Sequence, residues 1–142
     1  MPDPPVSALQ GVGPRIQVIL SPLETQLKNL ANRGALPPNP VSGFALIDTG
    51  ASSTCIDHDA ARSAGLAIAG SGPMSSATHV DETVPIYAGK IEILGISISV
   101  NVLKAYGSNL QAQGLIALIG RDVLNKCVLV YNGPDGSFSL SV

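Results

Sequence analysis

Short apolar runs, separated by glycines, prolines and polar clusters, divide this chain into elements that are mostly strands. Apolar residues that alternate, or that run continuously over a few positions, are typical of β-strands. The pattern predicts strands over residues 14–20, 41–47, 53–56, 90–94, 96–103, 115–119, 128–131 and 137–142. The 15 glycines and 11 prolines among the 142 residues fit tight turns between such strands. We therefore expect one mostly β domain.

Residues 21–40 interrupt the strand pattern and are expected to form an insertion between two strands. A Ser-Pro pair opens this segment, with Pro22 suited to the first position of a helix. Leucines at positions 23, 27 and 30 have helical spacing, and Gly34 is a candidate helix stop. The Pro-Pro-Asn-Pro run over 37–40 then requires an extended backbone. The insertion is therefore expected to hold a surface helix and an extended linker.

The remaining segments are read from their turn and cap residues. We expect a loose arm over residues 1–13, a helix over 58–64 capped by Asp57 and ended by Gly65, a hairpin within 70–88, a loop over 104–114, a helix over 121–126 and a turn over 132–136. The hairpin within 70–88 has a polar tip, which is expected to be exposed.

The most informative stretch is the apolar strand that ends in Asp48. The run Phe-Ala-Leu-Ile from position 44 leads directly into Asp-Thr-Gly-Ala-Ser. A carboxylate at such a place is costly to bury unless it is hydrogen-bonded, paired or neutralised. Asp48 could simply cap a turn, because Asp-Thr-Gly is also good turn chemistry. A catalytic carboxylate is the alternative.

A second segment resembles this one. Ala-Leu-Ile-Asp-Thr-Gly over 45–50 is similar to Ala-Leu-Ile-Gly-Arg-Asp over 117–122. Both are apolar strands that break into a turn and lead into a short helix. Two similar half-units, packed about a pseudo-twofold axis, are expected from this weak repeat.

The two segments together resemble the retropepsin group of aspartic peptidases. Asp-Thr-Gly-Ala-Ser over 48–52 is similar to their active-site loop, and Leu-Ile-Gly-Arg-Asp-Val-Leu over 118–124 to their second apolar-Gly segment and helix. The resemblance covers about residues 14–142. It implies a retropepsin-like closed β-barrel, the acid protease fold, with one lobe per chain, short helices and a flap hairpin.

The resemblance implies an aspartic endopeptidase in which two carboxylates share one proton. One carboxylate acts as general base on a water while the protonated one polarises the peptide carbonyl. This chain carries a single Asp-Thr-Gly loop, so the second carboxylate is expected from a homodimer, which places Asp48 beside its own copy. The substrate would be a peptide or protein bound in extended form.

Further roles are implied residue by residue. Thr49 would link the two loops through its hydroxyl, Gly50 would bring backbone N–H groups close to the carboxylates, and residues 75–81 would form the flap tip. The substrate contacts expected in this way are Ala51, Ser76, Ala77, Thr78, His79, Val80 and Ile119. Pepsin-like enzymes often carry a hydroxyl residue at the position of Ala51. Without that donor, we expect a dyad less acidic than theirs.

Composition and charge exclude several function classes. The net charge is −2, and no Lys/Arg cluster suggests nucleic acid or an anionic membrane. The apolar runs are too short to span a bilayer, and the N-terminus lacks signal-peptide features, so a soluble cytoplasmic protein is expected. Cys55 and Cys127 are expected to be reduced. No cofactor or metal is expected.

Other readings compete at single residues. Cys55 and His58 could form a cysteine-nucleophile pair, although no third group is evident. Asp57, His58 and Asp59 could suggest a metal site, but adjacent residues cannot all face one way, so helix capping is favoured. Arg121 and Asp122 could pair locally, cap the helix or, by resemblance for Arg121, join interface ion pairs. A non-catalytic dimerisation or peptide-binding module is the alternative function.

Overall fold

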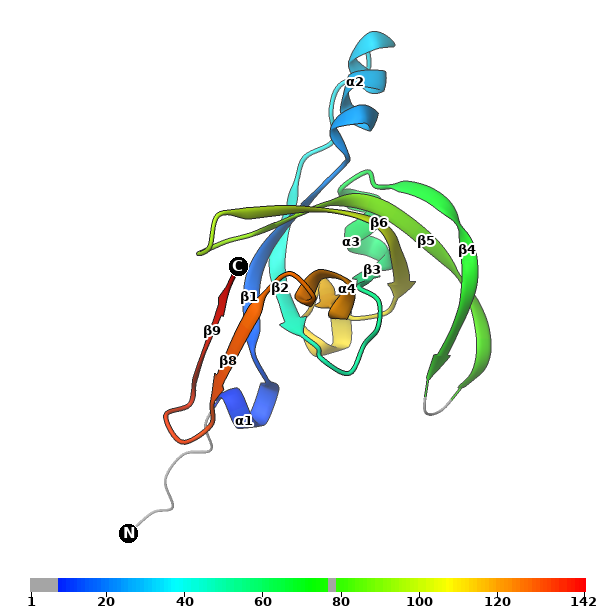
Figure 1. The fold of residues 1–142 in the computed structure, drawn as a ribbon. Coiled ribbons are helices and arrows are strands. Elements are labelled where there is room, and N and C mark those ends of the chain that lie inside the picture. Colours follow the sequence, from blue (N-terminus) through cyan, green and yellow to red (C-terminus); the bar gives the residue numbers. More distant parts are fainter. Residues whose placement is uncertain (1–7, 77–78) are drawn as a thin grey trace.

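Six strands of this protein close into a barrel, and a seventh extends one wall of it (Figure 1). The computed structural model describes residues 8–76 and 79–142. The strands are β1 (Arg15–Ser21), β2 (Val41–Ile47), β3 (Cys55–Asp57), β4 (Ala67–Ser76), β5 (His79–Ile93), β6 (Ile98–Ser108), β7 (Ala117–Ile119), β8 (Val128–Asn132) and β9 (Ser137–Ser141). The order of the large sheet is β1-β2-β7-β3-β6-β5-β4, and an added β1–β5 pairing closes it. The mostly β barrel predicted from the sequence is thus confirmed.

The barrel interior is filled by aliphatic side chains at alternate strand positions. Val18 and Leu20 of β1, Ile56 of β3, and Ile91 and Ile93 of β5 are at most 1% exposed. Successive side chains of a strand point to opposite faces, so these positions share the inner face. Burying each such side chain stabilises the fold by about 1.5–3 kcal/mol. This core holds the strand ends that carry the polar loops described below.

The two similar segments of the sequence lie side by side. β2 and β7 are parallel neighbours, with Ala45 opposite Ala117, Leu46 opposite Leu118 and Ile47 opposite Ile119. Parallel strands end at the same edge of a sheet, so the residues that follow β2 and β7 are brought together. The loop that begins at Asp48 therefore lies against the start of the helix that follows β7.

The helices are short, and their positions partly correct the sequence expectations. They are α1 (Ala8–Val12), α2 (Glu24–Asn32), α3 (His58–Ser63) and α4 (Arg121–Leu124), with a 3-10 turn, η1, over Gln111–Gln113. The expected loose arm over 1–13 is wrong for residues 8–12, which form α1. Leu9 is 4% exposed there, and burying this leucine stabilises the helix against the barrel.

Strand β6 is longer than the alternation pattern predicted. The expected loop over 104–114 is wrong for residues 104–108, which continue β6 and pair with β3 and β5. The register shifts where Tyr87 faces Ala105 but Gly89 faces Val102, so β6 carries an extra residue. Leu103 and Lys104 are consecutive and both exposed. This bulge breaks the two-residue alternation of buried and exposed side chains, so the sequence pattern did not reveal that residues 104–108 continue the strand.

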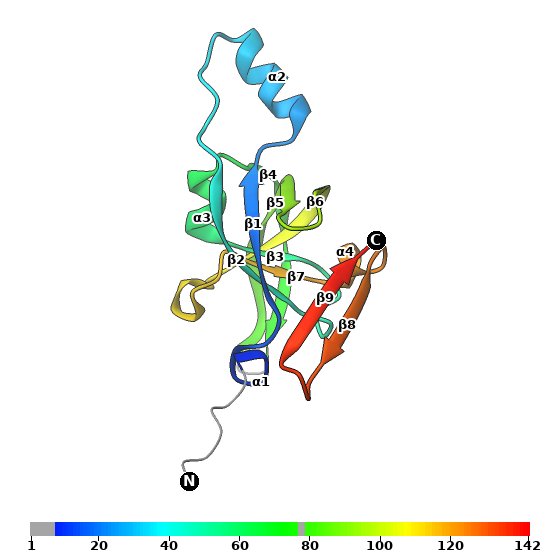
Figure 2. The same cartoon turned by 90° about the vertical axis from the view of Figure 1, so that its left-hand side faces the viewer.

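The insertion predicted over 21–40 is present, and its helix stands away from the barrel (Figures 1 and 2). No residue of α2 is buried. The helix begins at Glu24 rather than Pro22, because Pro22 is buried at the end of β1. Gln26 Nε2 donates to Gly65 O at 2.9 Å, which ties the insertion to the end of α3. Gly34 follows the helix with a φ of 71°, as expected of a helix stop.

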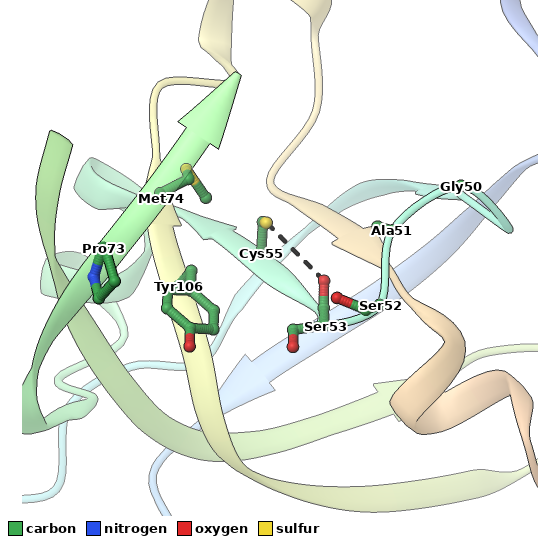
Figure 3. Close-up of a pocket in the computed structure, with 8 residues that line it drawn as sticks. All are labelled: Gly50, Ala51, Ser52, Ser53, Cys55, Pro73, Met74 and Tyr106. Atoms are coloured by element: carbon green, nitrogen blue, oxygen red, sulfur yellow. Dashed lines mark hydrogen bonds between the residues drawn. The ribbon is translucent and has the colours of Figure 1, made fainter. Parts of the chain in front are cut away.

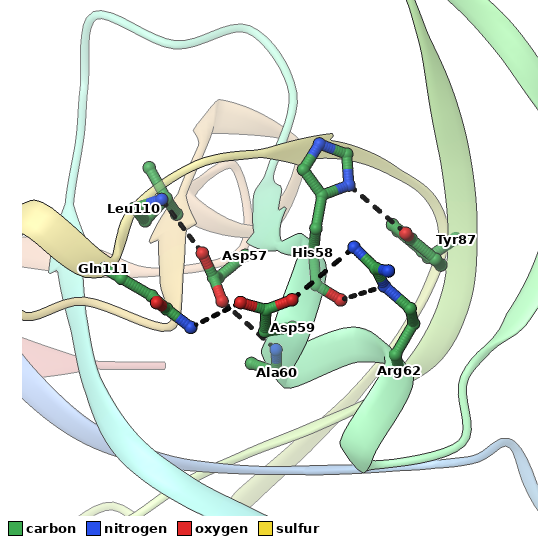
Figure 4. A network of polar contacts seen from close by, with 8 residues as sticks. All are labelled: Asp57, His58, Asp59, Ala60, Arg62, Tyr87, Leu110 and Gln111. Atoms are coloured by element: carbon green, nitrogen blue, oxygen red, sulfur yellow. Dashed lines mark hydrogen bonds and ion pairs between the residues drawn. The ribbon is translucent and has the colours of Figure 1, made fainter.

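Asp57 caps α3, as predicted, and is buried by doing so (Figure 4). Its Oδ2 accepts from Ala60 N at 3.1 Å, and its Oδ1 accepts from Leu110 N at 3.0 Å. Both oxygens of this 3% exposed carboxylate therefore have backbone donors. Asp57 joins α3 to the segment after β6, which explains its burial without a metal.

The last two strands form a separate hairpin beside the barrel (Figure 2). β8 and β9 pair with each other in a two-stranded sheet, as the turn over 132–136 predicted. Leu140 is buried in the barrel core, and Leu129 and Phe138 pack against it. Val128, Val130 and Tyr131 lie on β8 and are each more than half exposed. The hairpin therefore has one face on the core and apolar side chains left in solvent.

Candidate active site

Asp48 is the first residue after β2, at the edge where β2 and β7 end together. Its backbone N donates to Ile119 O at 2.9 Å, so the first residue of the loop is fixed to β7. Its Oδ1 accepts from Gly50 N at 2.9 Å, and its side chain stays partly exposed. A Cβ added at Gly50 would lie 3.2 Å from Oδ1, tighter than ordinary contact. Glycine therefore lets the backbone donor approach the carboxylate.

Arg121, the first residue of α4, holds the loop from the other side. Its guanidinium Nη1 donates to Thr49 O at 2.7 Å, and its backbone N donates to Ala51 O at 2.8 Å. These two bonds fix the carbonyls on either side of Gly50. The described residues do not show the local pairing with Asp122 that was considered for Arg121: its guanidinium bonds the backbone of the Asp48 loop, 72 positions away in the sequence. An interface ion pair of Arg121 stays a prediction.

A buried threonine behind the loop completes this network. Thr54 is fully buried, and its Oγ1 donates to Asp122 Oδ1 at 2.8 Å while accepting from Gly120 N at 3.1 Å. Thr54 N also donates to Asp122 Oδ2, at 3.1 Å. Asp122 therefore receives two bonds from one residue of the loop, and both its carboxylate oxygens are used. Sequence reasoning did not single out Thr54, although a hydroxyl residue entering an apolar strand was a signal.

Gly120 allows the two segments to approach this closely. A Cβ placed there would lie 2.6 Å from the carbonyl carbon of Ser53 and 2.7 Å from its oxygen. Real contacts are never that short, and the obstacle is backbone, which cannot rotate away. Gly120 is therefore required by packing, with an ordinary extended φ of −90°.

A pocket lies between the Asp48 loop and strand β4 (Figure 3). Its volume is about 330 Å³, and its lining residues are Gly50, Ala51, Ser52, Ser53, Cys55, Pro73, Met74 and Tyr106. Burial, together with the negative charges of Asp48 and Asp122, raises the pKa of the Cys55 thiol to about 11. Asp48 therefore lies close enough to this pocket for its negative charge to act on the Cys55 thiol.

The structure brings together several of the residues singled out from sequence. Asp48, Thr49, Gly50 and Ala51 form one loop, and Gly50 and Ala51 line the pocket. Ile119 is fully buried in the core, so its side chain has no surface to offer a substrate.

The flap tip is described only in part. Ser76 and His79 face each other across the β4–β5 hairpin, so the predicted hairpin is present. Ala77 and Thr78 lie outside the described residues, as do the side chains of Ser76, His79 and Val80. Their expected substrate contacts stay predictions.

The competing chemistries find little support in the geometry. His58 Nδ1 faces Tyr87 Oη at 3.3 Å, whereas Cys55 Sγ lies 3.9 Å from Ser53 O, so thiol and imidazole have different partners (Figures 3 and 4). Asp59 pairs with Arg62 on the surface of α3. Within the described ranges, 8–76 and 79–142, no group of His, Cys, Asp and Glu is arranged to hold a metal ion. No helix in the same ranges is long and apolar enough to cross a membrane.

A closed barrel whose Asp-Thr-Gly loop follows one of two parallel strands is the arrangement of the retropepsin-like fold. The family model of the gag-polyprotein putative aspartyl protease matches residues 39–126, more than half of the chain. The protein therefore belongs to that family. Comparison with curated proteins and comparison with solved structures each found no match.

Proposed function

We propose that this protein is an aspartic endopeptidase whose catalytic dyad is formed by Asp48 from each of two copies. One observation carries the proposal: the partly exposed Asp48 carboxylate is held at the strand edge by Gly50 N, in a loop fixed by Arg121. The buried cap Asp57, by contrast, has both carboxylate oxygens bonded to backbone N–H groups, one in its own helix and one after β6. Asp48 Oδ1 receives one backbone bond, from Gly50 N, and the residue stays half-exposed rather than buried.

The second carboxylate has to come from a second chain. Asp122 is the nearby acidic group in the site, but Thr54 engages both its oxygens. A twofold axis beside the loop would bring the partner subunit's Asp48 next to Asp48. Two carboxyls at that distance share one proton. The ionised one takes a proton from water, the water attacks the peptide carbonyl, and the protonated one stabilises the developing oxyanion.

The β8–β9 hairpin is the surface that best fits the partner. Val128, Val130 and Tyr131 expose apolar surface there, and Val142 at the chain end is also exposed. Val128 and Val130 lie two positions apart on β8 and so share one face of the strand, and an exposed apolar patch is typical of an interaction site. The edges of a two-stranded sheet also leave backbone groups that a second copy can pair with. A dimer built on this hairpin would cover both.

The substrate would lie extended between the Asp48 loop and the β4–β5 hairpin. Strand β4 has one partner, β5, so its other edge is free to pair with a peptide backbone. Ala51 and Gly50 line the pocket on the opposite side. A peptide in this position would present its backbone to the dyad.

The first test is cleavage of a mixed peptide library by the wild type, Asp48→Asn and Asp59→Asn. Asp59 is the matched control, because its pairing with Arg62 is on the surface and such pairs contribute little to stability. Cuts made by wild type and D59N, and absent with D48N, would support the proposal. A folded wild type that binds peptides and cuts none would favour the binding-module alternative.

Mixing experiments test the dimer. Adding excess Asp48→Asn chain to a fixed amount of wild type is expected to abolish cleavage, because each mixed dimer contains Asp48 in only one of its two chains. D59N added in the same excess should not inhibit. Unchanged cleavage in excess D48N would show that one chain works alone and would overturn the shared dyad.

A further inference from the structure

A second pocket lies away from the Asp48 loop, between the inserted segment and the outer face of the barrel. Its volume is about 550 Å³. The insertion leaves the barrel where β1 ends and β2 begins (Figure 2), whereas Asp48 follows the other end of β2. The pocket is therefore separate from the candidate active site. Its lining residues are Leu23, Glu24 and Thr25 from the start of the insertion, Lys90 from β5, and Ser99, Asn101 and Leu103 from β6.

The floor of this second pocket is built on paired strands. Lys90 faces Ser21 of β1 on one side and Asn101 of β6 on the other, so the three side chains form a row across the outer face. Ser99, Asn101 and Leu103 follow one another at alternate positions of β6, and all three are exposed. Hydrogen-bonded strands, rather than a loop, therefore fix the position of the floor.

Lys90 is a half-buried cation without an anionic partner. In the part of the chain that the structure describes, the one ion pair joins Arg62 to Asp59, so neither Glu24 nor Glu92 pairs with Lys90. Glu24 is exposed in the first turn of α2, where water and the helix N-terminus both stabilise its charge. The Lys90 ammonium has lost part of its hydration without such a partner, so it gains from an anion brought against it.

The first half of β6 also offers a free strand edge. Along one edge β6 pairs with β5, but along the other it pairs with β3 only from Tyr106 onward. Among the described residues, no strand pairs with that second edge over 98–104, so its backbone donors and acceptors are open to another chain. The strand carries one charged residue, the exposed Lys104. A segment added at this edge would place alternate side chains on the face that forms the pocket floor.

We propose that the second pocket and the β6 edge bind an extended, acidic segment of a partner protein, which adds to β6 as a strand. An acidic side chain of this segment would meet Lys90, and an aliphatic one would contact Leu103 and Leu23. Backbone hydrogen bonds supply affinity in this mode, and the pocket selects the side chains. Lys104 favours the same negative charge on the partner. This goes beyond the proposed peptidase function, because the bound segment does not contact the Asp48 loop.

A charge reversal at Lys90 tests the site. The probe is a fluorescent peptide that alternates threonine with leucine, aspartate and leucine in turn, and its binding to the Asp48→Asn chain is followed by anisotropy, so that no cleavage interferes. Adding Lys90→Glu should weaken binding by about tenfold or more, and should favour a matched peptide with lysine in place of aspartate. Lys90→Gln, which adds no negative charge, should weaken binding without this reversal.

A matched control separates the pocket from net charge. Lys126→Glu makes the same change of charge at an exposed residue that does not line the pocket. It should leave binding of the aspartate peptide within about twofold, because an exposed charge outside the site is screened by salt. Binding that Lys90→Glu leaves unchanged, or that Lys126→Glu weakens equally, would overturn the proposal.

The apolar contact and the strand pairing have tests of their own. Leu103→Ser should weaken binding about fivefold or more, whereas Ile68→Ser should not. Leu103 and Ile68 are 63% and 68% exposed, and Ile68 does not line the pocket, so both variants should fold. Successive N–H groups of an extended peptide point to opposite edges. N-methylation of one alternate set should therefore abolish binding, and N-methylation of the other should be tolerated; equal binding by the two peptides would exclude strand addition.

Sedimentation of Leu103→Ser tests whether a second copy occupies the edge instead. A fall in self-association with unchanged peptide binding would assign the β6 edge to a contact between copies and would overturn the proposal. All peptide measurements use the Asp48→Asn chain, so their outcome does not depend on the peptidase proposal. Selective binding of the aspartate peptide would stand even if the wild type cleaves nothing, and its absence would leave the catalytic dyad untouched.

Discussion

Thr54→Val tests whether the threonine hydroxyl behind the Asp48 loop holds that loop against the start of α4. Valine keeps the shape of threonine and removes the hydroxyl that bonds Asp122 at 2.8 Å and Gly120 N at 3.1 Å. The buried Gly120 N–H would then lack its partner, which costs about 1–3 kcal/mol. Losing the charge-assisted hydrogen bond to Asp122 adds about 1 kcal/mol to this cost. The figure is smaller than for a buried carboxylate, because the exposed Asp122 can be hydrated instead. The added methyl offsets about 0.8 kcal/mol.

The expected net loss is about 1–3 kcal/mol of unfolding free energy. Urea unfolding measures it, and with a slope of about 2 kcal/mol per molar the midpoint should fall by about 0.5–1.5 M. Thr54→Ser is the control, since it keeps the hydroxyl and loses one methyl, for about 1 kcal/mol. If the valine variant is as stable as the serine variant, the hydroxyl does not have the role assigned to it.

Four further results are expected. Val130→Lys should shift the protein toward monomer in sedimentation and reduce cleavage, because it places a charge in the proposed interface; dimer stability equal to that of wild type would contradict this. In a Cys127→Ser background, Cys55 should react with iodoacetamide at pH 8 about a hundredfold more slowly than an ordinary thiol, because its pKa is about 11 rather than 9.0. Mass spectrometry measures the rate of labelling, and labelling at the ordinary rate would refute this expectation. Replacing residues 23–39 by Asn-Gly should cost no more than about 1–2 kcal/mol in thermal unfolding, since α2 has no buried residue and one side-chain bond is lost; a variant that fails to fold would contradict this. Ala51→Thr should move the acidic limb of the pH–rate profile to lower pH, because an added hydroxyl favours the ionised dyad; an unmoved limb would count against that role for Ala51.

The parts of the fold that follow from local pattern were predictable. The strand before Asp48, the Asp57 cap and the β8–β9 hairpin are each determined by nearby residues, and each is present. The similarity of 45–50 and 117–122 predicted two similar half-units, and the structure adds that their strands are parallel neighbours. The local sequence pattern was sufficient to predict a strand wherever the alternation of apolar and polar residues was unbroken.

Long-range contacts were not predictable in the same way. Thr54 and Asp122 are 68 positions apart, and their hydrogen bond depends on β3 and β7 being neighbours. The burial of Leu9 in α1 likewise depends on a barrel surface made by other elements. The β6 bulge hid a strand because two consecutive exposed residues look like a loop. Each miss arises where a tertiary partner, rather than sequence spacing, determines the conformation.

The strand pairings also determine when the active site can form during synthesis. The loop at Asp48 has its partners in Ile119 and Arg121, and the barrel closes when β1 meets β5. A nascent chain emerging from the ribosome N-terminus first would contain the Asp-Thr-Gly residues long before these partners exist. Closing such long loops is also slow compared with forming local structure. Translation through Arg121 must therefore precede the formation of this loop structure, so a product that ends earlier would carry the Asp-Thr-Gly sequence without its geometry.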